Sequence, residues 1–372
     1  MNVEIQTELL KEALNKSVKI ASKHVSLPVL SCLLIKAEGK SVSIMATNLE
    51  LGIDIKIPAK VLKEGEVAVP ADVLWNLISQ IQGVLKIEIK LTIDNNLKII
   101  SGSSEGVIKT VPYGDFPSIP TITDPVSSLT IKAQYFAELS KSVLYSASIS
   151  SIKPELSSIL YYLNENDELV AVATDLFRLA EKKIALKKHK EFDKMLISVK
   201  NILEVLKVFQ DIKGDIDIIV KDNQVAFIVE DIYVVSRTVD SAFPDYKQII
   251  PKEYKTEVTL LKQDFTNALK ILRVFTDKLQ HLKFNIAPKN NVFEMFMKNT
   301  DIGESNSKIT AKVEGESLTI SFNFRYISDV LGAIPEDSIK LEFNGIGKAV
   351  VIRGVGNQSF LYLVMPLVTK NE

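Results

Sequence analysis

The sequence predicts an α+β fold made of three similar domains, each with two helices on antiparallel strands. Three observations support this. The 372 residues repeat a pattern about every 125 residues. Helix-like and strand-like periodicities follow one another in the same order within each repeat. Hydrophobic residues make up 46% and charged residues 24% of the chain, a balance typical of globular proteins that bury a core.

Each repeat opens with a strand-like stretch followed by an amphipathic helix. The three stretches read VEIQTELLKEALNKSVKIAS, LTIKAQYFAELSKSVLYSAS and VTLLKQDFTNALKILRVFTD. Lys16-Ser17-Val18 recurs as Lys141-Ser142-Val143, an offset of 125 residues. Apolar residues at helical spacing in these stretches predict first helices within residues 7–23, 133–153 and 262–283.

A hairpin-like pair of strands follows each first helix. LSCLLIKAEGKSVSIMATNLEL corresponds to LSSILYYLNENDELVAVATDLFRL and, more loosely, to LQHLKFNIAPKNNVFEMFMKNTDI. Thr47-Asn48, Thr174-Asp175 and Thr300-Asp301 mark the same point in the three copies, spaced by 127 and 126 residues. Alternating apolar residues with Asn, Asp or Gly between them predict antiparallel strands.

A second helix then follows a short strand in each copy, within residues 71–81, 199–213 and 323–334. Closing strands come next, with GDFPSIP recurring as SAFPDYKQIIP and the third copy ending in SFLYLVMPL. Polar, proline-bearing segments near residues 124 and 253 suggest the boundaries. The expected domains are therefore 1–125, 126–254 and 255–372.

Composition leaves little room for metal or nucleophilic chemistry. The three histidines lie 165 and 92 residues apart, without Cys, Asp or Glu at ligand spacing. GSSEG matches a nucleophile-elbow pattern but lies between two strand-like runs, which favours a hairpin turn. The glycine cluster GIGKAVVIRGVG matches no phosphate-binding fingerprint and favours tight turns around a strand. We therefore expect no cofactor, no metal and no catalytic residues.

The cellular setting is predicted from one cysteine and the first residues. Cys32 has no second cysteine to pair with, and the opening residues are charged where a signal peptide would be apolar. No stretch approaches the roughly 18 uninterrupted apolar residues of a membrane span. These features predict a cytoplasmic protein without a membrane partner.

The charge is nearly balanced overall, at −1, which by itself argues against a nucleic-acid partner. The six helical ranges above, however, carry +6, which leaves −7 elsewhere. If neighbouring repeats join edge to edge, the helices cover one face of the sheet, and a mildly basic face would attract phosphates without reading bases. Aromatic residues do not alternate with these lysines, so duplex backbone suits the face better than single strands. An ordinary solvated face is the alternative.

Several motifs resemble one family, the bacterial sliding clamps, which are beta subunits of DNA polymerase III. They are ATDLFRLA at 173–180, AFPDYKQIIP at 242–251, FNFRYISDVL at 322–331 and YLVMPL at 362–367. The resemblance covers essentially the whole chain, in the family's order and spacing. It implies three clamp domains in each chain and a head-to-tail homodimer that closes into a six-domain ring. The ring would encircle double-stranded DNA without sequence specificity, and helices would line its hole. It also implies a processivity function without catalysis.

The resemblance further implies a peptide cleft between the second and third domains. Its partners would be the DNA polymerase III catalytic subunit, the clamp loader complex, and other polymerases and repair proteins that carry clamp-binding peptides. The matching cleft residues are Leu156, Thr174, Leu176, Phe177, Arg178, Leu179, Pro244, Ile249, Asn323, Tyr326, Leu363, Met365, Pro366 and Leu367. Apolar side chains would form a concave surface, and Arg178, Asn323 and Tyr326 would hydrogen-bond the peptide.

Two further sets follow from the same resemblance. The DNA-facing positions are Lys23, His24, Lys153 and Lys200, and the dimer interface pairs Val107, Ile108 and Val111 of the first domain with Ile271 and Leu272 of the third. The chain departs from the family at Leu176, Phe177 and Gln248, and it continues as VTKNE after MPL. A repeat-built interaction scaffold that never encircles DNA, and an enzyme with an unrecognised site, are the alternative functions.

Overall fold

The computed structural model describes residues 1–21, 27–125, 127–186 and 192–367. Among them, the three repeats have one order of elements: a strand, a helix, four strands, a second helix and three strands. The predicted repeat and its α+β character are therefore confirmed. The described chain divides into two compact units, residues 1–137 with 187–238 and residues 138–186 with 239–372, and this division runs through the second expected domain.

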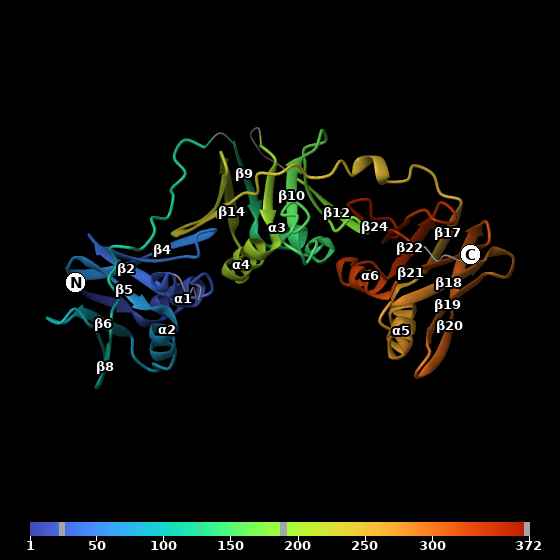
Figure 1. The fold of residues 1–372 in the computed structure, drawn as a ribbon. Coiled ribbons are helices and arrows are strands. Elements are labelled where there is room, and N and C mark those ends of the chain that lie inside the picture. Colours follow the sequence, from blue (N-terminus) through green and yellow to red (C-terminus); the bar gives the residue numbers. More distant parts are fainter. Residues whose placement is uncertain (22–26, 126, 187–191, 368–372) are drawn as a thin grey trace. The chain divides into compact units, whose positions relative to one another are not determined.

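Unit 1 contains the whole first repeat and part of the second (Figure 1). Its helices are α1 (Thr7–Ser17), α2 (Ala71–Ser79), α4 (Val199–Phe209) and the start of α3 (Ala133–Lys141). Its strands are β1 (Asn2–Gln6), β2 (Cys32–Glu38), β3 (Ser41–Thr47), β4 (Leu51–Lys63), β5 (Gly65–Pro70), β6 (Lys86–Leu91), β7 (Leu97–Ser101), β8 (Ser104–Ile108), β9 (Ser127–Lys132), β13 (Met195–Ser198), β14 (Asp215–Lys221), β15 (Gln224–Val229) and β16 (Ile232–Arg237).

Unit 1 has one long antiparallel sheet in the order β8-β7-β6-β1-β4-β16-β15-β14-β9. β4 also pairs with β3, which continues through β2 to β5. The β4–β16 pair, with Leu51 opposite Ser236, joins the first repeat to the second edge to edge, as expected. Helix α1 packs against β3, β4, α2 and α4, so its apolar stripe is covered by its own repeat and the next.

Unit 2 contains the rest of the second repeat and the whole third repeat. Its helices are α5 (Lys262–Leu272) and α6 (Phe324–Asp329), and Figure 1 shows α5 beside β18–β20. Its strands are β10 (Ser158–Leu163), β11 (Glu168–Thr174), β12 (Arg178–Ala185), β17 (Thr256–Leu261), β18 (His281–Ala287), β19 (Val292–Asn299), β20 (Gly303–Gly315), β21 (Leu318–Asn323), β22 (Ser338–Phe343), β23 (Val350–Gly354) and β24 (Phe360–Val364).

Unit 2 is also organised by one antiparallel path, β10-β11-β12-β24-β23-β22-β17-β20-β19-β18-β21. The β12–β24 pair, with Arg178 opposite Val364, is the second edge-to-edge joint between repeats. The core under α5 is aromatic: the ring of Phe284 lies 5.2 Å from that of Phe293 and 5.4 Å from that of Phe322. Phe265 of α5 packs on the same cluster, with its ring 6.1 Å from that of Phe293, so this core holds α5 on the sheet.

The helices are shorter than predicted, which corrects the charge assignment. As observed, α4 and α5 each carry +1, α2 carries −1, and the other three are neutral, so the helices together carry +1 instead of +6. The remaining positive charge belongs to the segments that follow the first helices, at +2 for 18–23, +1 for 142–153 and +2 for 273–283. The excess of basic residues therefore lies in the sequence after the first helices and not within them.

Two motifs for which the sequence favoured a hairpin turn and tight turns around a strand have that structure. Gly102 and Ser103 of GSSEG form the turn between β7 and β8, with Gly102 at φ 59°, and its other three residues begin β8. GIGKAVVIRGVG surrounds β23, with Gly345, Gly347 and Gly356 at positive φ. No helix in the described ranges is long and apolar enough to cross a membrane.

Candidate functional site

The loop between β11 and β12 in unit 2 is fixed by two side chains. Thr174 Oγ1 donates to the carbonyl of Arg178 at 2.7 Å and accepts from the amide of Leu176 at 3.0 Å. Asp175 Oδ1 accepts from the amides of Phe177 at 3.0 Å and Arg178 at 2.9 Å. These bonds hold Leu176 at φ 76°, a conformation that costs free energy outside glycine. Leu176 and Phe177 are consequently presented to solvent, 53% and 63% exposed.

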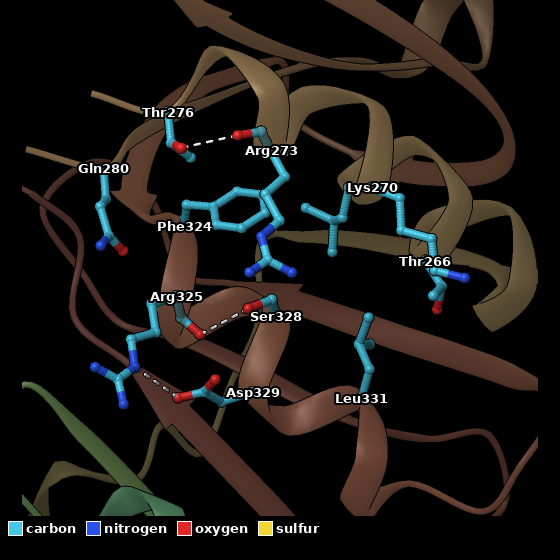
Figure 2. Close-up of a pocket in the computed structure, with 11 residues that line it drawn as sticks. Thr266, Lys270, Arg273, Thr276, Gln280, Phe324, Arg325, Ser328, Asp329 and Leu331 are labelled. Atoms are coloured by element: carbon cyan, nitrogen blue, oxygen red, sulfur yellow. Dashed lines mark hydrogen bonds and ion pairs between the residues drawn. The ribbon is translucent and has the colours of Figure 1, made fainter. Parts of the chain in front are cut away.

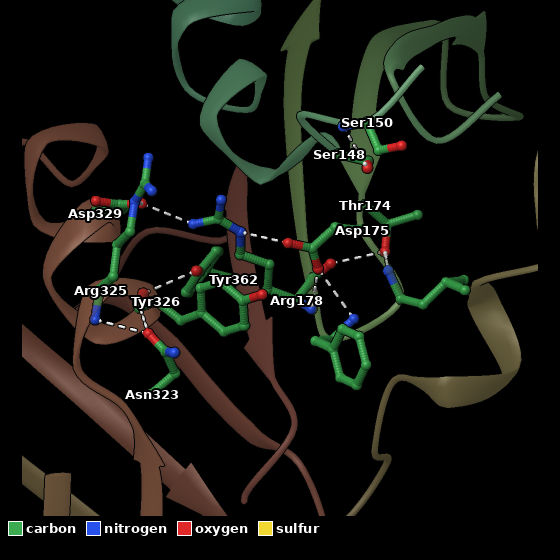
Figure 3. Close-up of polar contacts among 12 residues, drawn as sticks. Ser148, Ser150, Thr174, Asp175, Arg178, Asn323, Arg325, Tyr326, Asp329 and Tyr362 are labelled. Atoms are coloured by element: carbon green, nitrogen blue, oxygen red, sulfur yellow. Dashed lines mark hydrogen bonds and ion pairs between the residues drawn. The ribbon is translucent and has the colours of Figure 1, made fainter. Parts of the chain in front are cut away.

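The side chain of Arg178 joins this loop to helix α6 (Figure 3). Its Nε lies 3.0 Å from Asp175 Oδ2, and its Nη1 lies 2.7 Å from Asp329 Oδ2. Its Cζ lies 4.4 Å from the ring centroid of Tyr326. Burial lowers the pKa of Arg178, but its ion pairs with Asp329 and Asp175 help to outweigh burial, and the pKa is raised overall. The guanidinium therefore stays charged and forms a buried cross-link with a cation–π contact.

The start of α6 is held by its N-cap. Asn323 Oδ1 accepts from the amides of Arg325 at 2.9 Å and Tyr326 at 3.3 Å, which satisfies helix donors that would otherwise lack partners. The hydroxyl of Tyr362, on β24, donates to the carbonyl of Tyr326 at 2.8 Å. Burial raises the pKa of Tyr362, so this hydroxyl keeps its proton. These bonds leave the Tyr326 ring beside Arg178 in a fixed position.

A cavity of about 390 Å³ lies between these parts of unit 2. It is lined by the β11–β12 loop, by the start of α6 and by residues 147–150. Phe177, Arg178, Asn323 and Tyr326 of the predicted cleft all line it. The fold therefore brings together residues that are almost 150 positions apart in the sequence.

The fourteen predicted cleft residues all belong to unit 2 but differ in exposure. Leu176, Phe177, Ile249 and Met365 are exposed. Half-buried positions are Pro244, Asn323, Tyr326, Pro366 and Leu367, and buried ones are Leu156, Thr174, Arg178, Leu179 and Leu363. The amide of Met365 donates to the carbonyl of Phe177 at 2.8 Å, so the start of the C-terminal segment runs beside the loop.

These positions change the roles expected for some residues. Leu179 and Leu363 pack in the core cluster that includes Tyr246, so they support the cleft from beneath. Arg178 is only 4% exposed, and two of its donor nitrogens already have carboxylate partners. The expected hydrogen bond from Arg178 to a peptide is thus limited to its remaining N–H groups. Asp175 and Asp329 were not among the predicted cleft residues. Asp175 is a local partner, three residues from Arg178, whereas no local motif signals the pair with Asp329, which spans 151 residues.

A second cavity in unit 2, of about 500 Å³, lies between α5 and α6 (Figure 2). Lys270 and Arg273 reach it from α5 and the residues directly after it, and both are exposed. Neither has an ion-pair partner within the part of the chain that the structure describes. Arg325 lines the opposite side, with Nε 3.6 Å from Asp329 Oδ2. These cations can bind phosphate groups. Lys270, Arg273 and Arg325 contributed to the charge of the predicted helices but were not among the predicted DNA-facing residues.

The predicted DNA-facing residues fall in different parts of the chain. Lys200 is exposed at the second position of α4 in unit 1, and Lys153 is exposed in unit 2. Within the described ranges neither forms an ion pair. Lys23 and His24 lie outside the described residues.

The predicted dimer residues include exposed and buried positions. In unit 1, Val107 is 58% exposed on β8, the last strand of the sheet path, whereas Ile108 is 7% exposed and Val111 is half-buried. In unit 2, Ile271 is 57% exposed and the neighbouring Leu272 is fully buried. Val107 and Ile271 are therefore available for direct contact, while Ile108 and Leu272 pack inward.

Three consecutive α+β repeats, joined through antiparallel strands, define the class of DNA-clamp proteins. Models of the DNA polymerase III beta subunit match in order: its N-terminal domain over residues 1–120, its central domain over 130–245 and its C-terminal domain over 247–368. The chain belongs to the DNA polymerase III beta subunit family, the beta sliding clamps.

Individual relatives agree with this assignment. The beta sliding clamp of Staphylococcus epidermidis is 27% identical, over 99% of this chain and 100% of the relative. The solved DNA polymerase III beta subunit of Thermotoga maritima is 28% identical, with a TM-score of 0.92 and 99% of each chain covered. The solved sliding clamp of Bacillus subtilis shares the fold, with a TM-score of 0.93, 24% identity and 99% of each chain covered.

Proposed function

We propose that the chain is a DNA polymerase processivity factor: two copies close head to tail into a ring that encircles duplex DNA, slides along it and tethers the polymerase. The observation that carries this proposal is the match of all three family domains, in order, along one chain. An interaction scaffold that never encircles DNA is not favoured, because the Staphylococcus relatives that match over the full length are named beta sliding clamps.

The proposed DNA contact is electrostatic and independent of sequence. Lys153, Lys200, Lys270 and Arg273 are exposed cations, and Lys23 and His24 join them by resemblance. Exposed cations of this kind, on and after the helices, attract phosphates at long range without strong local binding. A weak, non-specific field of this kind suits a ring that must slide.

The proposed partner site is the cleft beside the β11–β12 loop. Leu176, Phe177 and Met365 offer exposed apolar surface, and Met adapts to different ligands. Ile249 and Pro244 extend this surface. Short, partly apolar peptides from the polymerase III catalytic subunit, the clamp loader complex, other polymerases and repair proteins would bind here. Gln248 would leave the rim without a cation that the family often has there.

The ring would be closed by Val107 on the edge strand β8 of one copy and Ile271 of the other. The chain itself would be non-catalytic and would work in the cytoplasm, on DNA. Loading would depend on a partner ATPase, so we expect no ATP hydrolysis by the chain alone.

DNA topology tests encirclement. After loading by a clamp loader onto nicked circular duplex, the protein should co-elute with the DNA, and linearisation with a restriction enzyme should release it. Linear DNA with both ends blocked by a bound protein is the matched control and should retain the clamp. Equal retention on circular and open linear DNA would contradict encirclement and favour the scaffold.

Peptide binding tests the cleft separately. Met365→Ala and Leu176→Ala should each weaken binding of a polymerase-derived peptide about tenfold or more, because anchors at the centre of an interface dominate affinity. Ile346→Ala, at another exposed apolar position of unit 2, is the control and should bind normally. Unchanged affinity in both cleft variants would place the peptide elsewhere.

A further inference from the structure

Unit 1 contains a cavity that the function proposed above does not use. It measures about 290 Å³ and lies at the joint between β4 and β16. Leu49, Glu50, Pro117 and Arg237 are among the residues that line it. This joint occupies the same place between the first and second repeats as the β12–β24 joint occupies between the second and third.

The loop before β4 repeats the hydrogen bonds of the β11–β12 loop. Thr47 Oγ1 donates to the carbonyl of Leu51 at 3.0 Å and accepts from the amide of Leu49 at 3.1 Å. Asn48 Oδ1 accepts from the amides of Glu50 at 3.0 Å and Leu51 at 2.8 Å, as Asp175 does in unit 2. Leu49 has φ 76°, the same value as Leu176, and is 43% exposed.

The strand beside this loop, β16, is equivalent to β24 beside the β11–β12 loop, but the side chains at equivalent positions differ. The amide of Arg237 donates to the carbonyl of Glu50 at 2.9 Å, just as the amide of Met365 donates to that of Phe177 at 2.8 Å. An arginine therefore stands where the candidate peptide cleft has Met365, and a glutamate stands where it has Phe177. The two joints therefore have the same backbone hydrogen bonds, but charged side chains in unit 1 replace apolar ones in unit 2.

The wall of the unit 1 cavity is held in place. A Cβ added at Gly52 would lie 3.0 Å from Ile119 Cγ2, so the segment around Ile119 packs directly on β4. The hydroxyl of Tyr233 accepts from the amide of Ile122 at 2.9 Å and lies 3.2 Å from the carbonyl of Pro120. The cavity is thus formed before any ligand binds, which lowers the entropy lost on binding.

We infer that this joint is a second peptide cleft, which takes a short extended segment carrying one carboxylate next to an apolar side chain. The inference rests on the proposed function, since the β12–β24 cleft supplies the model for peptide binding. Arg237 is exposed and has no ion-pair partner within the described part of the chain, so it offers a cation to the carboxylate. Leu49 and Pro117 supply the apolar surface. Glu50 disfavours a second acidic residue.

Methyl NMR of the full-length chain, labelled in its leucine methyl groups, tests this cleft. The probe is Ac-Leu-Asp-NH2, and its neutral isostere Ac-Leu-Asn-NH2 is the matched control. We expect saturable shifts of the Leu49 methyl signals, half-complete on the order of 1 mM, as is usual for so small a ligand. Ac-Leu-Asn-NH2 should bind at least fivefold more weakly, and Arg237→Gln should abolish this preference.

Two readouts keep this test separate from the proposed function. A polymerase-derived peptide read at the Leu176 methyls reports the unit 2 cleft, and Arg237→Gln should leave that signal unchanged. Gly52→Ala, which pushes Ile119 from its position, should remove the Leu49 shifts while the other leucine signals of unit 1 show that the fold persists. Silent Leu49 signals, or equal binding of the two dipeptides, would overturn the second cleft even when Leu176 responds normally.

Discussion

Arg178 donates from Nη1 to Oδ2 of Asp329 at 2.7 Å, which connects the β11–β12 loop to helix α6. The Arg178 side chain is 4% exposed and that of Asp329 is 26% exposed, so water screens the pair only in part. We expect Asp329→Asn to lower the free energy of unfolding of unit 2 by about 1–2 kcal/mol, because Arg178 loses a charged partner but keeps Asp175. Urea unfolding followed by circular dichroism measures this.

Hydrogen exchange localises the same effect. Amides of the loop 175–177 and of α6 should exchange faster in Asp329→Asn, because the cross-link holds both. Arg325→Gln is the matched control: its contact with Asp329 is 3.6 Å long and its side chain is 57% exposed, so its loss should cost less than 0.5 kcal/mol. Equal effects of the two substitutions would mean that the Arg178–Asp329 pair contributes no more to the free energy of unfolding than an exposed ion pair does.

Ile271 provides the test of the proposed dimer. This side chain is 57% exposed beside a fully buried Leu272, and burying it against a second copy would gain apolar contact. Ile271→Glu should therefore convert a species near twice 41.4 kDa into one of 41.4 kDa, as measured by light scattering. Ile346→Glu, at another exposed isoleucine of unit 2, should remain dimeric. A dimer in both variants would exclude Ile271 from the interface.

The sequence predicts the fold well because the same order of strand-like and helix-like segments occurs three times. Thr47 and Thr174 end equivalent strands, as predicted, but in the third copy the equivalent strand ends at Asn299, so Thr300 lies one residue past that point. Helix ends were predicted too long, because periodicity continues where hydrogen bonding stops. After α3, for example, the amide of Ser142 still donates to the carbonyl of Glu138 at 3.0 Å, but that of Val143 donates to the carbonyl of Ser140 at 3.2 Å, so the α-helical pattern ends there.

Four of the predicted cleft residues line one cavity, but the ion pairs that arrange them were not predicted. The exposed Leu176 and Phe177 follow from a polar turn whose hydrogen bonds are local, so sequence can indicate them. The burial of Arg178 depends on Asp329, which reaches it only through the β12–β24 joint. Long-range pairing of this kind leaves no signal in a single sequence.

Cys32 should be unreactive in the folded protein. Its side chain is 1% exposed in a cluster with Val29 and Ala68, and burial raises the pKa of its thiol. Because the thiolate is the reactive form, Ellman's reagent at pH 8 should label the native chain at least 100-fold more slowly than the chain in urea. Ser103→Cys, in the exposed turn between β7 and β8, is the control and should react at once. Fast labelling of native Cys32 would show that this part of unit 1 opens readily.

Asp54 on β4 predicts how the stability of unit 1 depends on pH. Burial raises the pKa of Asp54, and Ser43 together with two lysines offsets this only in part. Its Oδ1 is buried without a hydrogen-bond partner within the described residues. A carboxyl group that holds its proton more tightly when folded favours the folded state at low pH. The stabilisation of the folded state by protonated Asp54 is therefore complete below the unfolded pKa of about 3.9. It is lost as pH rises through the raised pKa of the folded state.

Asp54→Asn removes this titration and should stabilise unit 1 at pH 7 by about 1 kcal/mol, the order of the cost of one buried unsatisfied polar group. The gain should shrink as pH falls towards 4, because the raised pKa of the wild-type carboxyl leaves a growing fraction of it protonated. Trp75, the single tryptophan, lies on α2 in unit 1, so its fluorescence during urea unfolding reports this unit. Asp215→Asn, at an exposed position of β14, is the control and should leave the urea midpoint unchanged at both pH 4 and pH 7. A gain for Asp54→Asn that is equal at pH 4 and pH 7 would refute the charge-burial explanation, because it would have to come from packing or hydrogen bonding.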